Sequence, residues 1–206
     1  MKIELQKAGK KYFREWIFRN VDICLEPGEK VAVLGPNGSG KSTFLQLLSG
    51  ALLSTEGSVI FSRKGEVINS ESVFRNVCIA APYLELIEEF TLKEIIDFHF
   101  SFKKSVNGFK SDDILQISGL EASRNKVFKH FSSGMKQRVK LSLALLSDVE
   151  IVLLDEPCSN LDATAINWYK DLVRDYGMER LIVVCSNNQL DEFAYCSRKM
   201  NMLDWK

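Results

Sequence analysis

The segment from Val31 to Thr43 contains residue types at a spacing that could bind phosphate. Val31 to Leu34 are four consecutive apolar residues, which predict a short buried strand, and the apolar stretch Phe44 to Leu48 predicts a helix. A strand, a glycine-rich loop and a helix, in that order, are the setting of a phosphate-binding loop. The loop residues that follow the strand are Gly35, Pro36, Asn37, Gly38, Ser39, Gly40, Lys41, Ser42 and Thr43.

Each part of this loop has an expected role. Glycines allow successive backbone N–H groups to turn toward a phosphate, and the N-terminal end of the next helix favours the same anion. Lys41 is expected to bridge the β- and γ-phosphate oxygens, and the hydroxyl of Ser42 to hold Mg²⁺. The loop therefore predicts nucleotide binding. The alternative is a glycine-rich strand-to-helix turn that binds nothing.

Two carboxylates, Asp155 and Glu156, follow a second apolar run from Ile151 to Leu154. The carboxyl ends of parallel strands gather at one edge of a sheet, so these acids are expected to meet the phosphates there. Asp155 would hold Mg²⁺, directly or through water. Glu156 would point toward an attacking water and act as its base. An ordinary solvated strand end is the alternative, and the loop upstream favours the catalytic interpretation.

Apolar strands alternate with helices along the chain, which predicts an α/β fold with a buried, largely parallel sheet. Short strands are expected before the loop, and a block of helices from Thr91 to Leu146 lies between two strand-rich halves. We expect one domain, with residues 1–82 and 148–206 forming the core and about 83–147 forming a helical subdomain. The further strands are expected at 3–5, 16–18, 21–25, 57–61, 77–80 and 181–185.

Composition narrows the class of protein. Lys plus Arg and Asp plus Glu number 27 each, so the chain lacks the net positive charge that would favour a nucleic-acid partner. Five cysteines without a Cys-x-x-Cys pair predict reduced thiols in a cytosolic protein. No secretion signal and no uncharged run of membrane-spanning length are apparent. A role at a membrane would therefore require another chain as the anchor.

Two aromatic regions leave alternatives open. Tyr12 is the residue we would choose to stack on a nucleobase, a contact of about 1–3 kcal/mol where bases meet aromatic rings; otherwise the rings near it simply cover the sheet. Thr91 and Glu94 form a capping box for a helix that contains three phenylalanines between 98 and 102. Those rings form the core of a helical subdomain, or part of their surface receives a membrane partner.

Four motifs in order resemble those of the ATP-binding cassette (ABC) ATPases, and the similarity covers nearly the whole chain. Residues 35–43 resemble Walker A, and 151–157 resemble Walker B with Glu156 as catalytic residue. Residues 131–138 resemble the ABC signature and its tail, and 159–162 the D-loop. The resemblance implies a P-loop NTPase core with an N-terminal antiparallel β subdomain and an inserted α-helical signature subdomain.

The same resemblance implies a function. Such a chain looks like the ATP-binding, ATP-hydrolysing subunit of a transporter, as in short single-cassette exporters including the heme-exporter-like branch. It would bind ATP and Mg²⁺, pair head-to-tail with an identical or different cassette, and drive separate transmembrane permease subunits from the cytoplasmic face of the membrane. No nucleic-acid partner is expected. Residues of the signature and D-loop would contact the nucleotide of the second subunit: Ser132, Ser133, Gly134, Met135 and Asp162.

The chain departs from the family pattern at several positions. Ser133 and Met135 stand where Gly and Gln are usual in the signature. Tyr83 stands at the Q-loop glutamine, and Asn187 at the switch histidine. Asparagine can hydrogen-bond a γ-phosphate but cannot carry a proton or charge, so we expect slow hydrolysis with Glu156 retained as base and Asn187 beside it. The alternatives are a nucleotide-gated dimerising module with little hydrolysis and a soluble ABC ATPase outside transport.

Overall fold

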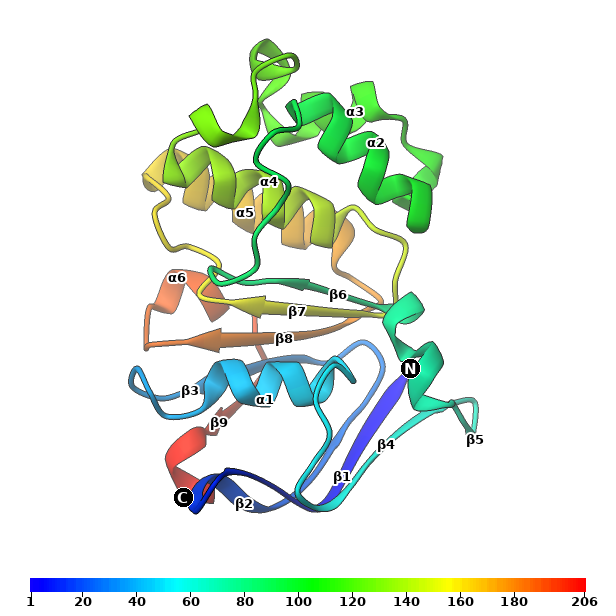
Figure 1. Cartoon of the computed structure of the whole chain (residues 1–206), viewed down its shortest axis with the longest axis vertical. Helices are drawn as coiled ribbons and strands as arrows, with labels where there is room; N and C mark the ends of the chain where they lie inside the picture. The colour runs from blue at the N-terminus through cyan, green and yellow to red at the C-terminus, as the bar shows by residue number, and fades with distance from the viewer. The chain divides into compact units, whose positions relative to one another are not determined.

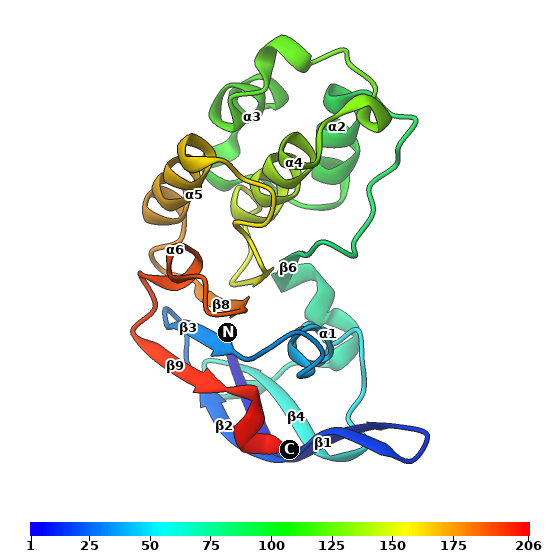
Figure 2. The same cartoon turned by 90° about the vertical axis from the view of Figure 1, so that its left-hand side faces the viewer.

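The computed structural model describes the whole chain of 206 residues except the side chain of Ser70. The chain forms two compact units (Figures 1 and 2). The first contains residues 1–79, 149–156 and 179–206, and the second contains 80–148 and 157–178. The first unit holds both sheets with helices α1 and α6, and the second holds helices α2 to α5.

An antiparallel sheet in the first unit has the strand order β2-β1-β4-β5. β1 and β2 form a hairpin that closes where Tyr12 pairs with Glu15. Both strands extend well beyond the predicted apolar segments because the backbone ladder continues through polar residues, with shifts of register between Leu5 and Lys11. The four strands are β1 (Lys2–Tyr12), β2 (Glu15–Leu25), β4 (Glu56–Arg63) and β5 (Glu66–Val67).

A five-stranded sheet with the order β6-β7-β8-β3-β9 forms the other half of this unit. The pairs β7–β8 and β8–β3 are parallel, as the apolar runs predict, and β9 pairs with β3 in parallel as well. Every residue of β7 and β8 is buried, which is typical of strands covered on both faces. The strands are β3 (Lys30–Leu34), β6 (Val77–Ala80), β7 (Ile151–Asp155), β8 (Leu181–Ser186) and β9 (Arg198–Asn201).

Helix α1 (Lys41–Leu48) follows β3 and packs against β7 and β8 (Figure 1). Its Phe44 is fully buried, with its ring edge-on to Phe18 at 5.7 Å and stacked on Trp205 at 5.5 Å. Trp205 belongs to a 3₁₀ turn, Met202–Trp205, near the end of the chain, and the short helix α6 (Leu190–Phe193) follows β8. A fully buried aromatic side chain stabilises the fold by about 1.5–3 kcal/mol, so these contacts hold α1 firmly.

The second unit is built from α2 (Leu92–Phe102), α3 (Ser111–Ser118), α4 (Ser133–Leu145) and α5 (Ala163–Tyr176). Helix α5, which we expected in the core with residues 148–206, belongs to this unit because it packs on α4. The indole N–H of Trp168 donates to the carbonyl of Ile117 at 2.8 Å, and the guanidinium of Arg138 lies over the Trp168 ring, 4.7 Å from its centre. These contacts join α3, α4 and α5.

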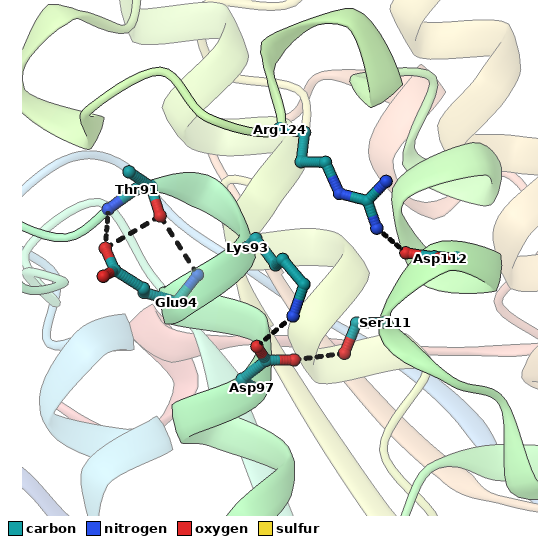
Figure 3. A network of polar contacts seen from close by, with 7 residues as sticks. All are labelled: Thr91, Lys93, Glu94, Asp97, Ser111, Asp112 and Arg124. Atoms are coloured by element: carbon teal, nitrogen blue, oxygen red, sulfur yellow. Dashed lines mark hydrogen bonds and ion pairs between the residues drawn. The ribbon is translucent and has the colours of Figure 1, made fainter.

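Polar contacts fix the N-terminal halves of α2 and α3 (Figure 3). The predicted capping box is present: the Thr91 N–H donates to Glu94 at 2.8 Å, and the Glu94 N–H donates to the Thr91 hydroxyl at 3.3 Å. Asp97 accepts from Lys93 at 2.5 Å and also from Ser111. Figure 3 shows Asp97 between these two side chains, so α2 and α3 are held together at this point.

The aromatic helix α2 buries one face and exposes the other. Leu92, Ile95 and Ile96 are buried, whereas Phe98 is 48% and Phe102 is 77% exposed. The core interpretation therefore does not hold for these two rings, which lie on the surface.

Among the described residues no helix has both the length and the apolar composition needed to cross a bilayer.

Candidate functional site

The loop between β3 and α1 places the residues of the predicted phosphate site. Pro36 to Ser39 form a turn, closed by the Ser39 N–H donating to the Pro36 carbonyl at 3.1 Å, with Asn37 and Gly38 at its exposed tip. Gly38 and Gly40 have φ of 77° and 102°, values that favour glycine. Gly40 is the residue before helix α1, whose first turn contains Lys41, Ser42 and Thr43.

Gly40 is required for a second reason, because a Cβ there would lie 2.5 Å from Cγ2 of Ile17. We expect Gly40→Ala to lower the free energy of unfolding by about 1–3 kcal/mol and to weaken nucleotide binding, from backbone strain together with the clash. Denaturant unfolding and ATP titration measure the two effects. Gly28→Ala is the matched control, since Gly28 has φ of 82° but a Cβ there would meet nothing within 4 Å. Equal loss of ATP affinity in both variants would contradict the prediction.

Two side chains suit the loop to an anion. The Lys41 ammonium donates to the carbonyls of Gly35 at 2.8 Å and Pro36 at 3.1 Å, and the residue is 5% exposed. The hydroxyl of Ser39 is buried without a hydrogen-bond partner. A buried, unpaired hydroxyl is costly unless a ligand completes it. With the N-terminal end of α1 beside them, these groups fit a phosphate group.

Asp155, the first acid of the Walker B motif, contacts the phosphate loop from the end of a neighbouring strand. Asp155 ends β7, and its Oδ2 accepts from the Ser42 hydroxyl at 2.6 Å. Burial raises the pKa of Asp155, and the nearby Glu156 charge adds to the rise, whereas the Ser42 hydrogen bond and the Lys41 charge oppose it. A carboxylate and a hydroxyl, both oxygen donors, are the ligands that Mg²⁺ prefers. The two residues that the sequence assigns to the metal are thus brought together and fit it.

Glu156 directly follows β7 and has an unusual backbone conformation. Its φ is 45°, and its N–H donates to the carbonyl of Cys185 at 2.9 Å. A non-glycine residue in the left-handed region costs about 1–3 kcal/mol, and such residues concentrate at functional sites. Anchoring by β8 holds Glu156 in this conformation beside Asp155.

The sheet register brings Asn187 to the same edge. Leu34, which precedes the loop, pairs with Ser186, and Asp155 pairs with Cys185. Asn187 follows Ser186 and is exposed. The ends of β3, β7 and β8 therefore present the phosphate loop, Glu156 and Asn187 along one edge of the sheet, as the sequence predicts for parallel strands. The catalytic role of Asn187 stays a prediction.

Some residues that support the loop were not predicted. Cys185 is fully buried, and its thiol lies 3.6 Å from the carbonyl oxygen of Lys41. Burial raises its pKa well above the ordinary value, which makes the thiol unreactive. Met202 packs close to the loop glycines: its Cβ would lie 3.3 Å from a Cβ placed on Gly35, and its Cε 3.5 Å from one placed on Gly40. A single apolar residue distant in sequence carries no signal of such a contact.

Tyr12 lies at the end of β1 and is 43% exposed, with the Lys10 ammonium 5.3 Å from its ring centre. The neighbouring Trp16 ring is already covered by cations, with Lys11 at 5.2 Å and Arg19 at 4.5 Å. Tyr12 therefore remains the more accessible of these two aromatic rings, and its stacking on a base stays a prediction.

The signature residues lie in the second unit at the start of α4. Ser132 caps the helix, its hydroxyl accepting from the Met135 N–H at 3.2 Å, and Ser133 is exposed. Gly134 admits a close approach of the D-loop, since a Cβ there would lie 2.7 Å from the Asn160 carbonyl oxygen. Asp162 caps α5 by accepting from the Ala165 N–H at 2.8 Å. A hollow of about 300 Å³ is lined by Ser132, Ser133, Gly134, Met135, Arg138 and Asp162, among others.

The phosphate loop, the Ser42–Asp155 pair and the fold together define a P-loop nucleotide-binding protein. Comparison with known proteins identifies the family: the family model described as ABC transporter matches residues 18–159. The chain is 30% identical over 196 residues to the ABC transporter ATP-binding protein YcbN of Bacillus subtilis, covering 93% of this chain and 64% of YcbN. It is 28% identical over 198 residues to the lantibiotic transport ATP-binding protein SrtF of Streptococcus pyogenes, covering 94% of this chain and 82% of SrtF.

Solved structures agree on the fold. The bacterial ABC transporter cassette MJ0796, described as dimeric, superposes with a TM-score of 0.79 at 24% identity, covering 97% of this chain and 93% of that one. A post-hydrolysis dimeric form of the same cassette, bound to ADP and Pi, has a TM-score of 0.81 at 23% identity over the same shares of the two chains. The chain belongs to the ABC transporter family and is an ATP-binding cassette with the predicted P-loop fold.

Proposed function

We propose that this chain is the ATP-hydrolysing subunit of a transporter, coupling ATP-driven pairing with a second cassette to movement of separate membrane subunits. The observation that carries the proposal is the 2.6 Å contact between Ser42 and Asp155, which joins the phosphate loop to the strand that presents Glu156. Relatives named as transport ATP-binding proteins support the transporter role. The chain would then lie in the cytoplasm, at the inner face of the membrane, through its membrane partner.

The chemistry follows from the groups at the sheet edge. Lys41 and the backbone N–H groups of the loop hold the phosphates, and Ser39 offers its unpaired hydroxyl. Ser42 and Asp155 would hold Mg²⁺, which would supply positive charge against the phosphate oxygens. Glu156 orients the attacking water and accepts its proton. Asn187 donates a hydrogen bond to the γ-phosphate as a neutral group.

Each cassette supplies the signature half of the site to its partner. The exposed Ser133, the capping hydroxyl of Ser132 and the start of α4 form an anion-binding helix end. In a head-to-tail dimer this end would meet the γ-phosphate bound by the other chain, so ATP would hold the dimer closed and hydrolysis would release it. The MJ0796 cassette, which has a similar fold, is described as dimeric, and this supports pairing of two cassettes.

The second unit contains an apolar hollow of about 220 Å³ that could receive part of the membrane subunit. It lies between the start of the second unit and α2, where Phe98, Phe102 and Ile87 are exposed. Exposed aromatic residues around a concave surface are typical of a binding site for an apolar helix. We propose that a cytoplasmic segment of the permease docks there.

Purified protein tests the function directly. We expect the protein to bind ATP and Mg²⁺ and to dimerise, which light scattering detects. Phosphate release should follow dimerisation. A nucleotide-gated module would dimerise without releasing phosphate. A soluble ABC ATPase would hydrolyse ATP but would not co-purify with a polytopic membrane protein.

Asn187→His is expected to raise kcat by about tenfold. A charge-assisted hydrogen bond to the γ-phosphate exceeds a neutral one by about 1–1.5 kcal/mol, which corresponds to that factor. The added contribution requires a protonated imidazole, so the ratio of variant to wild-type kcat should grow as the pH falls through about 6.5. Asn188→His, one residue beyond, is the control. An unchanged kcat in Asn187→His at every pH would show that residue 187 does not face the reacting phosphate.

A further inference from the structure

The segment between β6 and α2, residues 81–91, lies against helix α4, and we call it the connecting loop. Two lysines one turn apart on α4 reach it. The Lys140 ammonium donates to the carbonyls of Ala81 at 3.2 Å and Pro82 at 3.0 Å, and Lys136 pairs with Glu88 at 2.7 Å. The loop that begins the second unit is therefore fastened to the signature helix by side chains of that helix.

The two contacts differ in kind. The Lys136–Glu88 pair is exposed, with 54% of the Glu88 side chain accessible, and such pairs contribute little to stability. Lys140 is partly buried, and burial lowers its pKa, with the Lys136 charge adding to the fall and Glu85 opposing it. A partly buried ammonium that donates to two carbonyls makes the stronger, charge-assisted type of bond.

The acceptors are backbone carbonyls of the two residues that precede Tyr83. Tyr83 stands where the family pattern has the Q-loop glutamine, so this contact holds the loop whatever side chain occupies position 83. The same helix begins at the signature, where Ser132 caps it, and its Gln137 donates to the carbonyl of Pro157 at 2.9 Å. Helix α4 thus connects the loop, the signature and the residue that follows Glu156 in the chain.

We propose that Lys140 is a positioning residue that clamps the connecting loop to α4, so that the loop and the signature move as one body during the ATP cycle. The coupling rests on the proposed function; the clamp does not. In this cassette, displacement of the connecting loop by a docked partner would displace the signature end of α4, and the reverse. The direct lysine contact supplies a connection that the missing glutamine cannot.

Hydrogen exchange of the full chain without nucleotide tests the clamp. In Lys140→Met the protected amides of the loop, Leu84 and Phe90, should exchange at least about tenfold faster, as expected from losing hydrogen bonds to a charged group. The amides of 136–145 should stay within about twofold of wild type. Lys140→Arg keeps the donors, and Lys136→Met removes the exposed pair with Glu88 but leaves the Lys140 contacts, so both should resemble wild type. Unchanged loop exchange in Lys140→Met would overturn the proposal.

The same measurement with ATP and Mg²⁺, in a Glu156→Gln background that retains nucleotide, tests the coupling. We expect ATP to slow exchange in both 132–139 and 84–90 when Lys140 is present. With Lys140→Met, the slowing should remain in 132–139 and disappear from 84–90. Slowing of both segments without Lys140 would overturn the coupling. Slowing of neither segment in the Lys140 protein would instead overturn the proposed ATP-driven dimer, while the clamp is decided by the experiment without nucleotide.

Discussion

Replacement of Glu156 by glutamine is expected to abolish ATP turnover while ATP binding and ATP-dependent dimerisation remain. The amide has nearly the same shape as the carboxylate and can still hydrogen-bond a water, but it cannot accept a proton. A general base contributes about 10²–10⁴-fold, so kcat should fall by at least about a hundredfold. The backbone contact of residue 156 with Cys185 involves only main-chain atoms and should survive the change. Single-turnover phosphate release and light scattering with ATP measure the two halves of this expectation.

Glu150 provides the matched control because it immediately precedes β7, at the opposite end from Glu156. Glu150 is partly buried and pairs with Arg63 and with the N-terminal ammonium of Met1. Burial raises the pKa of Glu150, but the hydrogen bonds from these two cations outweigh it, so the pKa is lowered. Glu150→Gln should therefore lower stability with kcat unchanged. Retention of more than about a tenth of wild-type turnover by Glu156→Gln would assign the base to another group. Loss of dimerisation in the same variant would contradict the proposal that ATP binding alone closes the dimer.

The buried strands were predictable because their signal is local. The structure confirms β3, β6, β7 and β8 to within one residue, since each is an uninterrupted apolar run covered on both faces. β9 was not predicted, because Arg198–Asn201 alternates between partly buried and exposed residues and contains charge. Its pairing with β3 is made by backbone hydrogen bonds, which leave little trace in composition.

The same distinction applies to the site. The loop and the acids after β7 lie in continuous motifs whose chemistry depends on residue type, so the meeting of Ser42 with Asp155 could be inferred from the parallel sheet. Ile17, Cys185 and Met202 support the loop through packing and are far from it in sequence. Lys140 was overlooked for a related reason: a lysine on a helix surface is ordinary, and only the structure shows that its acceptors are the carbonyls of Ala81 and Pro82.

The membership of α5 illustrates a third limit. Helix α5 covers Ala163–Tyr176 and is capped by Asp162. Its place with α4 depends on Trp168, whose ring receives Arg138 and whose N–H reaches Ile117. An indole on an amphipathic helix does not reveal which neighbour covers it, so sequence order suggested the wrong companion for this helix.

Lys41→Ala is expected to weaken ATP binding by about 10- to 100-fold with the fold retained. The ammonium makes hydrogen bonds to the Gly35 and Pro36 carbonyls at 2.8 and 3.1 Å, and it is the cation of the phosphate loop. A hydrogen bond between charged groups is worth about 1.5–3 kcal/mol, which corresponds to that range of affinity. Equilibrium titration with a fluorescent ATP analogue measures the change, and denaturant unfolding measures stability.

Lys30 separates the two effects because it makes the same kind of contact away from the site. Its ammonium donates to the carbonyls of Gly28 and Arg180, both at 2.9 Å, and it is partly buried. Lys30→Ala should therefore lower stability by an amount similar to Lys41→Ala while ATP affinity stays within about twofold of wild type. Equal loss of affinity in the two variants would mean that Lys41 acts through the stability of the loop. Loss confined to Lys41→Ala would assign its charge to the phosphates, because a second lysine with equivalent carbonyl contacts does not affect them.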